Sequence, residues 1–162
     1  MKEISQYIDS NDIKNYIYHR GKMLLLSRIT QYSLNRYTLT GEYDITKDCI
    51  FYDENIKGIP NWVSFEFMAQ GASILSGIER RTLGKNLLHG IILSISDFKS
   101  NVDTLKVDTT IKVEVERKFY DKGGLISVYF CNLYKDRNSK EPNITAKVSV
   151  MESDDINNLF KD

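Results

Sequence analysis

Two polar side chains, four residues apart, interrupt the longest apolar stretch of the sequence. Glu66 and Gln70 lie within residues 59–85, which read as one long helix. Helical residues four apart share one face, so these two side chains should lie together. Burial raises the pKa of a carboxyl group because its charged form loses water, and such a group can act as an acid near neutral pH. Glu66 is therefore a candidate proton donor; a structural ion pair or a place in a subunit interface is the alternative.

The helix that carries this pair is nearly apolar all round, which predicts that it is buried. Its interior includes Trp62, and Pro60 and Asn61 are suited to its first turn and its cap. Gly84 marks its end. Gly77 is small enough for another backbone to come close.

Length and composition limit the classes of protein to consider. The 162 residues, with 22 basic and 22 acidic side chains, predict a single domain over residues 1–162 and give no basic block suited to nucleic acid. No apolar run approaches the roughly 20 residues needed to span a membrane, and the first residues do not resemble a signal peptide, so we expect a cytoplasmic protein. Cys49 and Cys131 are far apart and are expected to be packing residues rather than metal ligands.

The remaining elements are predicted mostly as strands, which gives an α+β fold with one sheet against the long helix. Ser10 or Asn11 is expected to cap a short helix in residues 10–18, and residues 154–162 are expected to add a helical turn. The last four strands are predicted to form a meander. The strands are expected at residues 23–30, 34–45, 87–98, 109–120, 125–135 and 143–151.

Two motifs in this order resemble a known family. YHRGKMLLLSRI at residues 18–29 and IPNWVSFEFMAQ at residues 59–70 resemble the signatures of hotdog-fold 3-hydroxyacyl-(acyl carrier protein) dehydratases of the FabA/FabZ type. The most similar branch is the dehydratase of aryl polyene biosynthesis, ApeP. A weaker match covers SDFK at residues 96–99.

The resemblance implies a dimeric hotdog fold with an acyl tunnel beside the central helix. The reaction would remove water from a 3-hydroxyacyl thioester and give the trans-2-enoyl product, without a metal or organic cofactor. Glu66 would protonate the departing hydroxyl, and Gln70 would orient Glu66 or line the tunnel. Backbone N–H groups near Trp62 and Val63 would hold the enolate oxygen that develops at the helix N-terminus.

The sequence departs from the family pattern at the usual histidine. Many members place this base in a loop fourteen residues before the helix glutamate, where this chain has Tyr52. His19, in the first motif, is the predicted replacement, while His89 is expected to be structural. Ser27 stands in place of the motif aspartate and would remove a partner for Arg28 or Arg20.

Two alternatives to a dehydratase remain open from the sequence. One is a hotdog thioesterase, whose carboxylate would activate water and which usually has no histidine paired with it. The other is a non-catalytic subunit that shapes the tunnel of a partner. The expected partners are an acyl carrier protein and a second hotdog protein, as a homodimer or heterodimer. The candidates for docking the carrier protein are Lys22, Arg80, Arg81 and Lys85.

Overall fold

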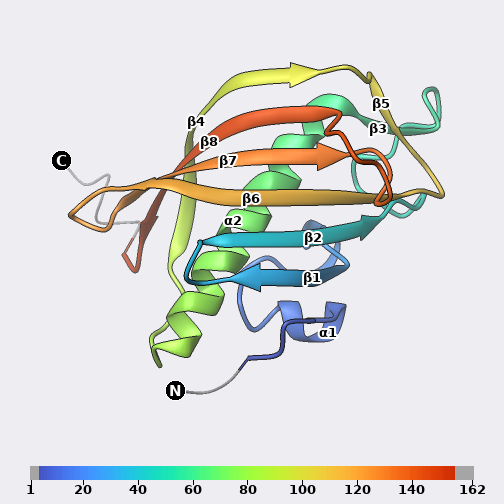
Figure 1. The fold of residues 1–162 in the computed structure, drawn as a ribbon. Coiled ribbons are helices and arrows are strands. Elements are labelled where there is room, and N and C mark those ends of the chain that lie inside the picture. Colours follow the sequence, from blue (N-terminus) through green and yellow to red (C-terminus); the bar gives the residue numbers. More distant parts are fainter. Residues whose placement is uncertain (1–3, 156–162) are drawn as a thin grey trace.

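A six-stranded antiparallel sheet wraps around one long helix, α2, in the computed structural model, which describes residues 4–155 (Figure 1). This is the α+β hotdog arrangement that the sequence predicts. Helix α2 spans Ser64–Thr82 and crosses behind the sheet in Figure 1. The strands follow the order β1-β2-β6-β7-β8-β4. Their bounds are β1 Arg28–Ser33, β2 Thr38–Asp44, β4 His89–Ser100, β6 Thr110–Tyr120, β7 Ile126–Tyr134 and β8 Ile144–Ser153.

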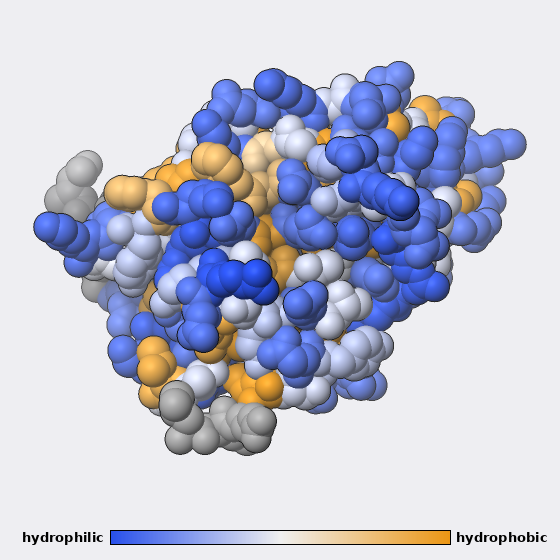
Figure 2. Space-filling view, in the orientation of Figure 1, coloured by the Kyte–Doolittle hydropathy of each residue, from blue (hydrophilic) through white to orange (hydrophobic). Residues whose placement is uncertain are grey.

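The last strands do not form a simple meander. Strands β6, β7 and β8 are consecutive neighbours, as predicted, but β4 pairs with β8 at the sheet edge rather than with β6. The physical reason is that β6 already has β2 on one side and β7 on the other. Both faces of β4 remain largely exposed, and Figure 2 shows hydrophobic side chains interrupting a mostly hydrophilic face near β4 and β7.

Helix α2 starts later than the sequence predicts. A short strand, β3 (Gly58–Pro60), pairs with β5 (Thr104–Lys106), and a 3₁₀ turn, η2 (Asn61–Val63), leads into the helix. Asn61 does not cap the helix, because its side chain donates to the Val102 carbonyl at 2.8 Å. Gly58 is needed in β3, since a Cβ there would collide with the Leu105 carbonyl. These contacts tie the start of α2 to β5, a pairing that local sequence patterns did not indicate.

The N-terminal segment also differs from the prediction. Helix α1 covers only Ser10–Ile13, and its cap is Asp9, whose carboxylate accepts hydrogen bonds from two backbone N–H groups. After a 3₁₀ turn, η1 (Gly21–Met23), the chain passes Leu25 and enters β1 only at Arg28. Leu25 and its neighbour are buried, but the predicted strand at residues 23–26 is wrong. The backbone there bonds to a side chain of α2 instead of to a strand. The expected C-terminal turn lies mostly outside the described residues.

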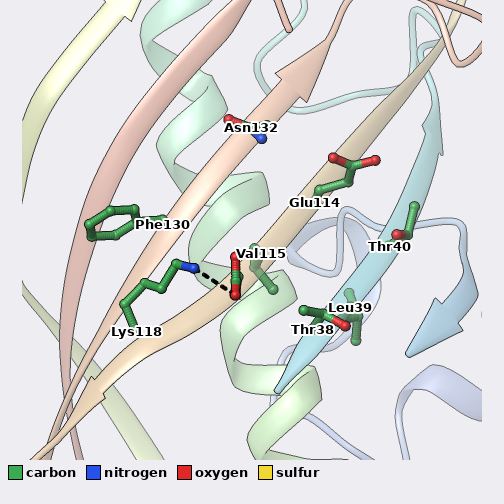
Figure 3. Close-up of a pocket in the computed structure, with 9 residues that line it drawn as sticks. Thr38, Leu39, Thr40, Glu114, Val115, Lys118, Phe130 and Asn132 are labelled. Atoms are coloured by element: carbon green, nitrogen blue, oxygen red, sulfur yellow. Dashed lines mark ion pairs between the residues drawn. The ribbon is translucent and has the colours of Figure 1, made fainter. Parts of the chain in front are cut away.

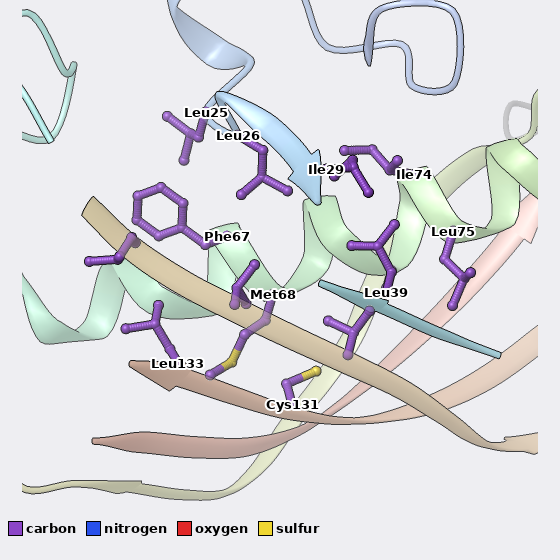
Figure 4. Packing of buried hydrophobic residues seen from close by; sticks show 14 of the residues in the cluster. Leu25, Leu26, Ile29, Leu39, Phe67, Met68, Ile74, Leu75, Cys131 and Leu133 are labelled. Carbon is purple, nitrogen blue, oxygen red and sulfur yellow. The ribbon is translucent and has the colours of Figure 1, made fainter. Parts of the chain in front are cut away.

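The core lies between α2, the sheet and the N-terminal segment. Figure 4 shows Met68 extending from α2 toward the sheet, near Cys131. Cys131 and Cys49 are buried free thiols, as expected. Trp62, by contrast, is 53% exposed, so the prediction that it belongs to the interior is wrong. Gly77 lies against the backbone of Tyr16, which confirms the close approach expected at that glycine.

Arg28 finds partners despite the serine that precedes it. Its guanidinium contacts Glu42 at 2.7 Å and Asp44 at 2.8 Å, on the neighbouring strand β2. Ser27 accepts a hydrogen bond from the Asp44 backbone N–H. The partner expected to be missing is therefore supplied by β2.

A polar cluster lies beneath the second half of α2. The Arg117 side chain, only 7% exposed, lies 3.3 Å from Glu79 and packs over the ring of Tyr37 at 3.6 Å. Glu152 of β8 is buried nearby and is within hydrogen-bond reach of Ser76. Burial raises the pKa of the Glu152 carboxyl, against the opposing effects of Ser76 and Arg117.

This burial predicts a pH-dependent gain in stability for Glu152→Gln. A folded-state pKa above the unfolded value gives stability that is full below the unfolded pKa and is lost as pH rises through the folded pKa. The parent therefore loses stability as pH rises above about 4, the ordinary pKa of a glutamate, whereas the neutral amide does not. Urea unfolding at a series of pH values above this point should show the variant gaining relative to the parent as pH rises. The exposed-carboxylate control Glu54→Gln should show no such gain, and a difference independent of pH would contradict the assignment.

Candidate active site

A cavity of about 320 Å³ lies between α2 and strands β4 and β8. Its walls combine the two candidate catalytic side chains with an amide, a hydroxyl and apolar groups. A hydrocarbon chain bound in the cavity would therefore contact apolar side chains of β4 and β8. The polar side chains of the lining lie mainly on α2. The lining residues are His19, Glu66, Ala69, Gln70, Ser73, Gly90, Ile91, Ile92 and Val150.

The structure brings His19 and Glu66 together in one chain. The distance from His19 Nε2 to Glu66 Oε1 is 3.5 Å, and the Glu66 side chain is 18% exposed. His19 Nδ1 is buried and has no hydrogen-bond partner among the described residues. The Glu66 carboxylate has its second oxygen, Oε2, free of hydrogen bonds from the described part of the chain. A histidine nitrogen and a carboxylate oxygen are thus side by side at the cavity wall, which is the arrangement that paired proton transfer requires.

The pKa of Glu66 differs in direction from the sequence-based expectation. A hydrogen bond with His19 lowers it most, and a second from Gln70 lowers it further, while burial works in the opposite direction. The prediction of a raised pKa is therefore wrong. Burial does raise the pKa of Glu66, but His19 and Gln70 lie on the same cavity wall and stabilise the charged form.

Gln70 is the residue that holds this wall together. Its amide nitrogen donates to the Met23 carbonyl at 2.8 Å and to Glu66 Oε1 at 2.9 Å. Its carbonyl oxygen accepts from the Leu25 backbone N–H at 2.9 Å. Every polar atom of the Gln70 amide is thus engaged, so Gln70 both orients Glu66 and fastens the segment that follows His19 to the helix.

Replacing Gln70 with leucine should destabilise the fold by about 1–3 kcal/mol, because the Leu25 N–H and the Met23 carbonyl lose their partner. Thermal and urea unfolding followed by circular dichroism would measure the loss. A suitable control is Ser73→Ala, one helical turn further along the same cavity wall. Equal stability of the Gln70→Leu protein and the parent would show that these backbone groups do not depend on the amide.

Arg20 shapes the junction that presents His19. Its guanidinium donates to the carbonyl oxygens of Ile17 at 2.6 Å and of His19 at 2.7 Å. These bonds fold the chain back on itself just before η1. Arg20 therefore acts on the backbone of this junction and pairs with no carboxylate of residues 4–155.

The other residues singled out from the sequence lie away from the cavity wall. Trp62 packs against Phe51 and stacks on Phe65, and Val63 is fully buried, so their proposed role in binding remains a prediction. Tyr52, at the position of the usual loop histidine, donates to Glu54 at 2.8 Å. His89 stacks on Tyr18 with ring centroids 4.1 Å apart, in keeping with a structural role.

The sequence reading did not identify the β4 and β8 residues of the cavity. Ile91, Ile92 and Val150 resemble ordinary strand residues, and nothing local marks them as a binding wall. Gly90 offered the one usable signal, because a glycine inside a strand often marks a close approach or an open space.

A second hollow lies on the outer face of the sheet, away from α2. Figure 3 shows it, with Lys118 paired to Glu116 at 2.7 Å and Phe130 beside the lysine. Its volume is about 430 Å³. It contains no histidine, unlike the cavity beside α2.

Comparison with known proteins assigns the chain to a family. The family model of the ApeP-like proteins, described as ApeP dehydratase, matches residues 11–161. The chain belongs to the ApeP-like dehydratase family. A search of curated protein sequences finds no significant match.

Solved structures show that the family fold is the hotdog fold. A chain of the dehydratase heterocomplex ApeI:P from Xenorhabdus doucetiae is similar with a TM-score of 0.80 and 16% identity, over 92% of this chain and 97% of that one. A hypothetical thioesterase with coenzyme A from Streptococcus pneumoniae TIGR4 has a TM-score of 0.56 and 11% identity, over 77% and 84%. A mutant thioesterase from Pseudomonas aeruginosa has a TM-score of 0.56 and 10% identity, over 77% and 79%. At these identities the likenesses establish the fold.

Within the part of the chain that the structure describes, no helix is both long and apolar enough to cross a membrane. Residues 4–155 also contain no cluster of three or more histidine, cysteine, aspartate or glutamate side chains that could hold a metal ion.

Proposed function

We propose that this chain removes water from 3-hydroxyacyl thioesters carried by an acyl carrier protein and forms trans-2-enoyl thioesters. The pathway we propose is aryl polyene or similar fatty-acid-like biosynthesis. The observation that carries the proposal is the contact of His19 with Glu66 at the wall of a largely apolar cavity. Membership of a dehydratase family supports the same class of reaction.

In the proposed reaction, neutral His19 takes a proton from C2 and Glu66 donates a proton to the hydroxyl on C3. The C3–O bond breaks, water leaves, and the electron pair of the C2–H bond forms the double bond. His19 then carries the extra proton and Glu66 lacks one. Transfer from His19 Nε2 to Glu66 Oε1, which lie 3.5 Å apart, restores the starting state.

This cycle begins with a protonated Glu66, although hydrogen bonds with His19 and Gln70 lower the pKa of its carboxyl. A bound acyl chain removes water from this carboxyl. Desolvation favours the neutral form of an acid. Substrate binding is therefore expected to raise the pKa of Glu66 and to favour the protonated form that the reaction needs.

The paired histidine also bears on the two alternatives. A hotdog thioesterase usually has no histidine beside its acid, and a non-catalytic subunit has no need of such a pair. The contact between His19 and Glu66 favours a dehydratase over both. The test is incubation of the purified chain with a 3-hydroxyacyl carrier protein, followed by mass spectrometry. Loss of water supports the proposal; release of free carrier thiol would replace it with the thioesterase.

We propose that a second hotdog protein pairs with the edge strand β4, as a homodimer or heterodimer. Leu93, Ile95 and Phe98 on this edge are 47%, 36% and 39% exposed, although they are large and apolar. An unpaired edge with such side chains is suited to strand addition. The heteromeric nature of the similar ApeI:P complex supports a partner of this fold.

The proposed carrier protein would approach near Lys22, which lies in the turn that follows His19. Arg80 and Arg81 bond to the carbonyls of Asn86 and Asn15. They stand at the opposite end of α2, so they form no single patch with Lys22. We propose the cytoplasm as the location, with no cofactor, no membrane and no nucleic acid involved.

A further inference from the structure

The buried carboxyl of Glu152 lies on the strand face that lines the candidate active-site cavity. Residues alternate between the two faces of a strand, so Val150 and Glu152 of β8 point to the same side. Val150 belongs to the cavity wall, and both residues are buried, with 5% and 8% of their surface exposed. On β8, Glu152 is therefore the next residue after Val150 whose side chain faces the same side as the cavity.

Gly90 leaves space beside this carboxyl. It lies directly opposite Glu152 in the pairing of β4 with β8, and it is itself a lining residue of the cavity. A Cβ atom at this position would lie 3.5 Å from Ser73 Oγ on α2. The absence of a side chain at Gly90 thus keeps the cavity open on the side where Glu152 begins.

Helix α2 continues the same line of polar groups. Ser73 lines the cavity, and Ser76, one turn further on, is buried and within hydrogen-bond reach of Glu152. At a rise of 1.5 Å per residue, Ser76 stands about 15 Å along the helix from Glu66. This length suits an extended acyl chain whose C3 atom lies beside Glu66.

Glu152 has hydrogen-bonding capacity that Ser76 does not exhaust. A protonated carboxyl carries one donor and several acceptor sites, and one serine hydroxyl uses only part of them. Burial raises the pKa of this carboxyl, while Ser76 and Arg117 act in the opposite direction. A methyl group pressed against it would displace water without replacing the lost hydrogen bonds, whereas a hydroxyl would replace them.

We propose that Glu152 and Ser76 form the polar end of the acyl cavity and select chains that carry a hydroxyl group at their far end. The inference rests on the proposed function and specifies its substrate. It makes Glu152 a specificity-determining residue, distant from the reacting atoms.

The test is calorimetric binding of saturated acyl pantetheine thioesters to the full chain, in matched pairs of equal length that end in either a methyl or a hydroxyl group. Such thioesters have no 3-hydroxyl group, so turnover does not interfere. At the length that spans the cavity, the hydroxyl-ended chain should bind about five- to tenfold more tightly, the effect of one good hydrogen bond. Glu152→Met should reverse this preference, and Glu152→Gln, which keeps a donor and an acceptor, should retain most of it.

The matched control is Glu79→Gln, because Glu79 contacts Arg117 in the same polar cluster, whereas it is Glu152 that lies opposite Gly90 of the cavity wall. This control should keep the preference of the parent. Equal binding of both chain types by the parent, or an unchanged preference in Glu152→Met, would overturn the role of Glu152 alone. Failure of every acyl thioester to bind would overturn it together with the proposed function.

Discussion

Glu66→Gln is expected to lower kcat for dehydration by about 10²- to 10⁴-fold, the usual contribution of a positioned acid or base. Glutamine has the size of glutamate, and its carbonyl oxygen can still accept from Gln70, as Glu66 Oε1 does at 2.9 Å. The amide cannot give up a proton to the departing hydroxyl. Steady-state rates with a 3-hydroxyacyl carrier protein would measure the effect, with circular dichroism to establish that the fold is retained.

His19→Ala provides the companion variant. If the two groups act as one pair, the double variant should be about as slow as the slower single variant, because groups that act together are strongly non-additive. Glu79→Gln is the matched control on the same helix, since it removes a carboxylate outside the cavity. A Glu66→Gln protein that keeps most of the parental rate would exclude Glu66 as the proton donor. Such a result would not change the assignment of the fold or of the family.

Much of the secondary structure around Glu66 and His19 was predictable from local sequence patterns. The four-residue spacing of Glu66 and Gln70 placed them on one helical face, and the structure joins them by a hydrogen bond. Alternation along residues 109–120 and 125–135 located β6 and β7 to within a residue or two. Periodicity reports on the immediate surroundings of each residue, so it succeeds where a long element has one environment along its length.

The failures concern contacts between segments that are distant in the sequence. Leu25 lies in an apolar run that is typical of a strand, yet its N–H bonds to Gln70 of α2. The pKa of Glu66 depends on His19, which precedes it by 47 residues in the numbering. Glu152 is the last residue but one of strand β8, and only the pairing with β4 puts it opposite Gly90. No local pattern encodes such approaches.

Gly77→Ala, which adds a single methyl group, is expected to lower both the stability of the fold and the activity of the site. In an exposed helix, glycine to alanine stabilises by about 1 kcal/mol. Here the new Cβ would collide with the carbonyl oxygen of Tyr16, a backbone atom that cannot rotate away. Overpacking of this kind costs about 1–3 kcal/mol. We therefore expect a lower free energy of unfolding, measured by urea titration.

The same substitution should reduce activity more than its effect on stability implies. Tyr16 lies three residues before His19, so a helix pushed away from this segment moves His19 away from Glu66. Gly71→Ala is the matched control, because its Cβ would meet side-chain methyl groups instead of backbone, those of Val115 at 3.1 Å and 3.7 Å and of Leu39 at 3.8 Å. It should leave both properties close to those of the parent. If Gly77→Ala unfolds more easily but retains full activity in the folded state, the position of His19 does not depend on this contact.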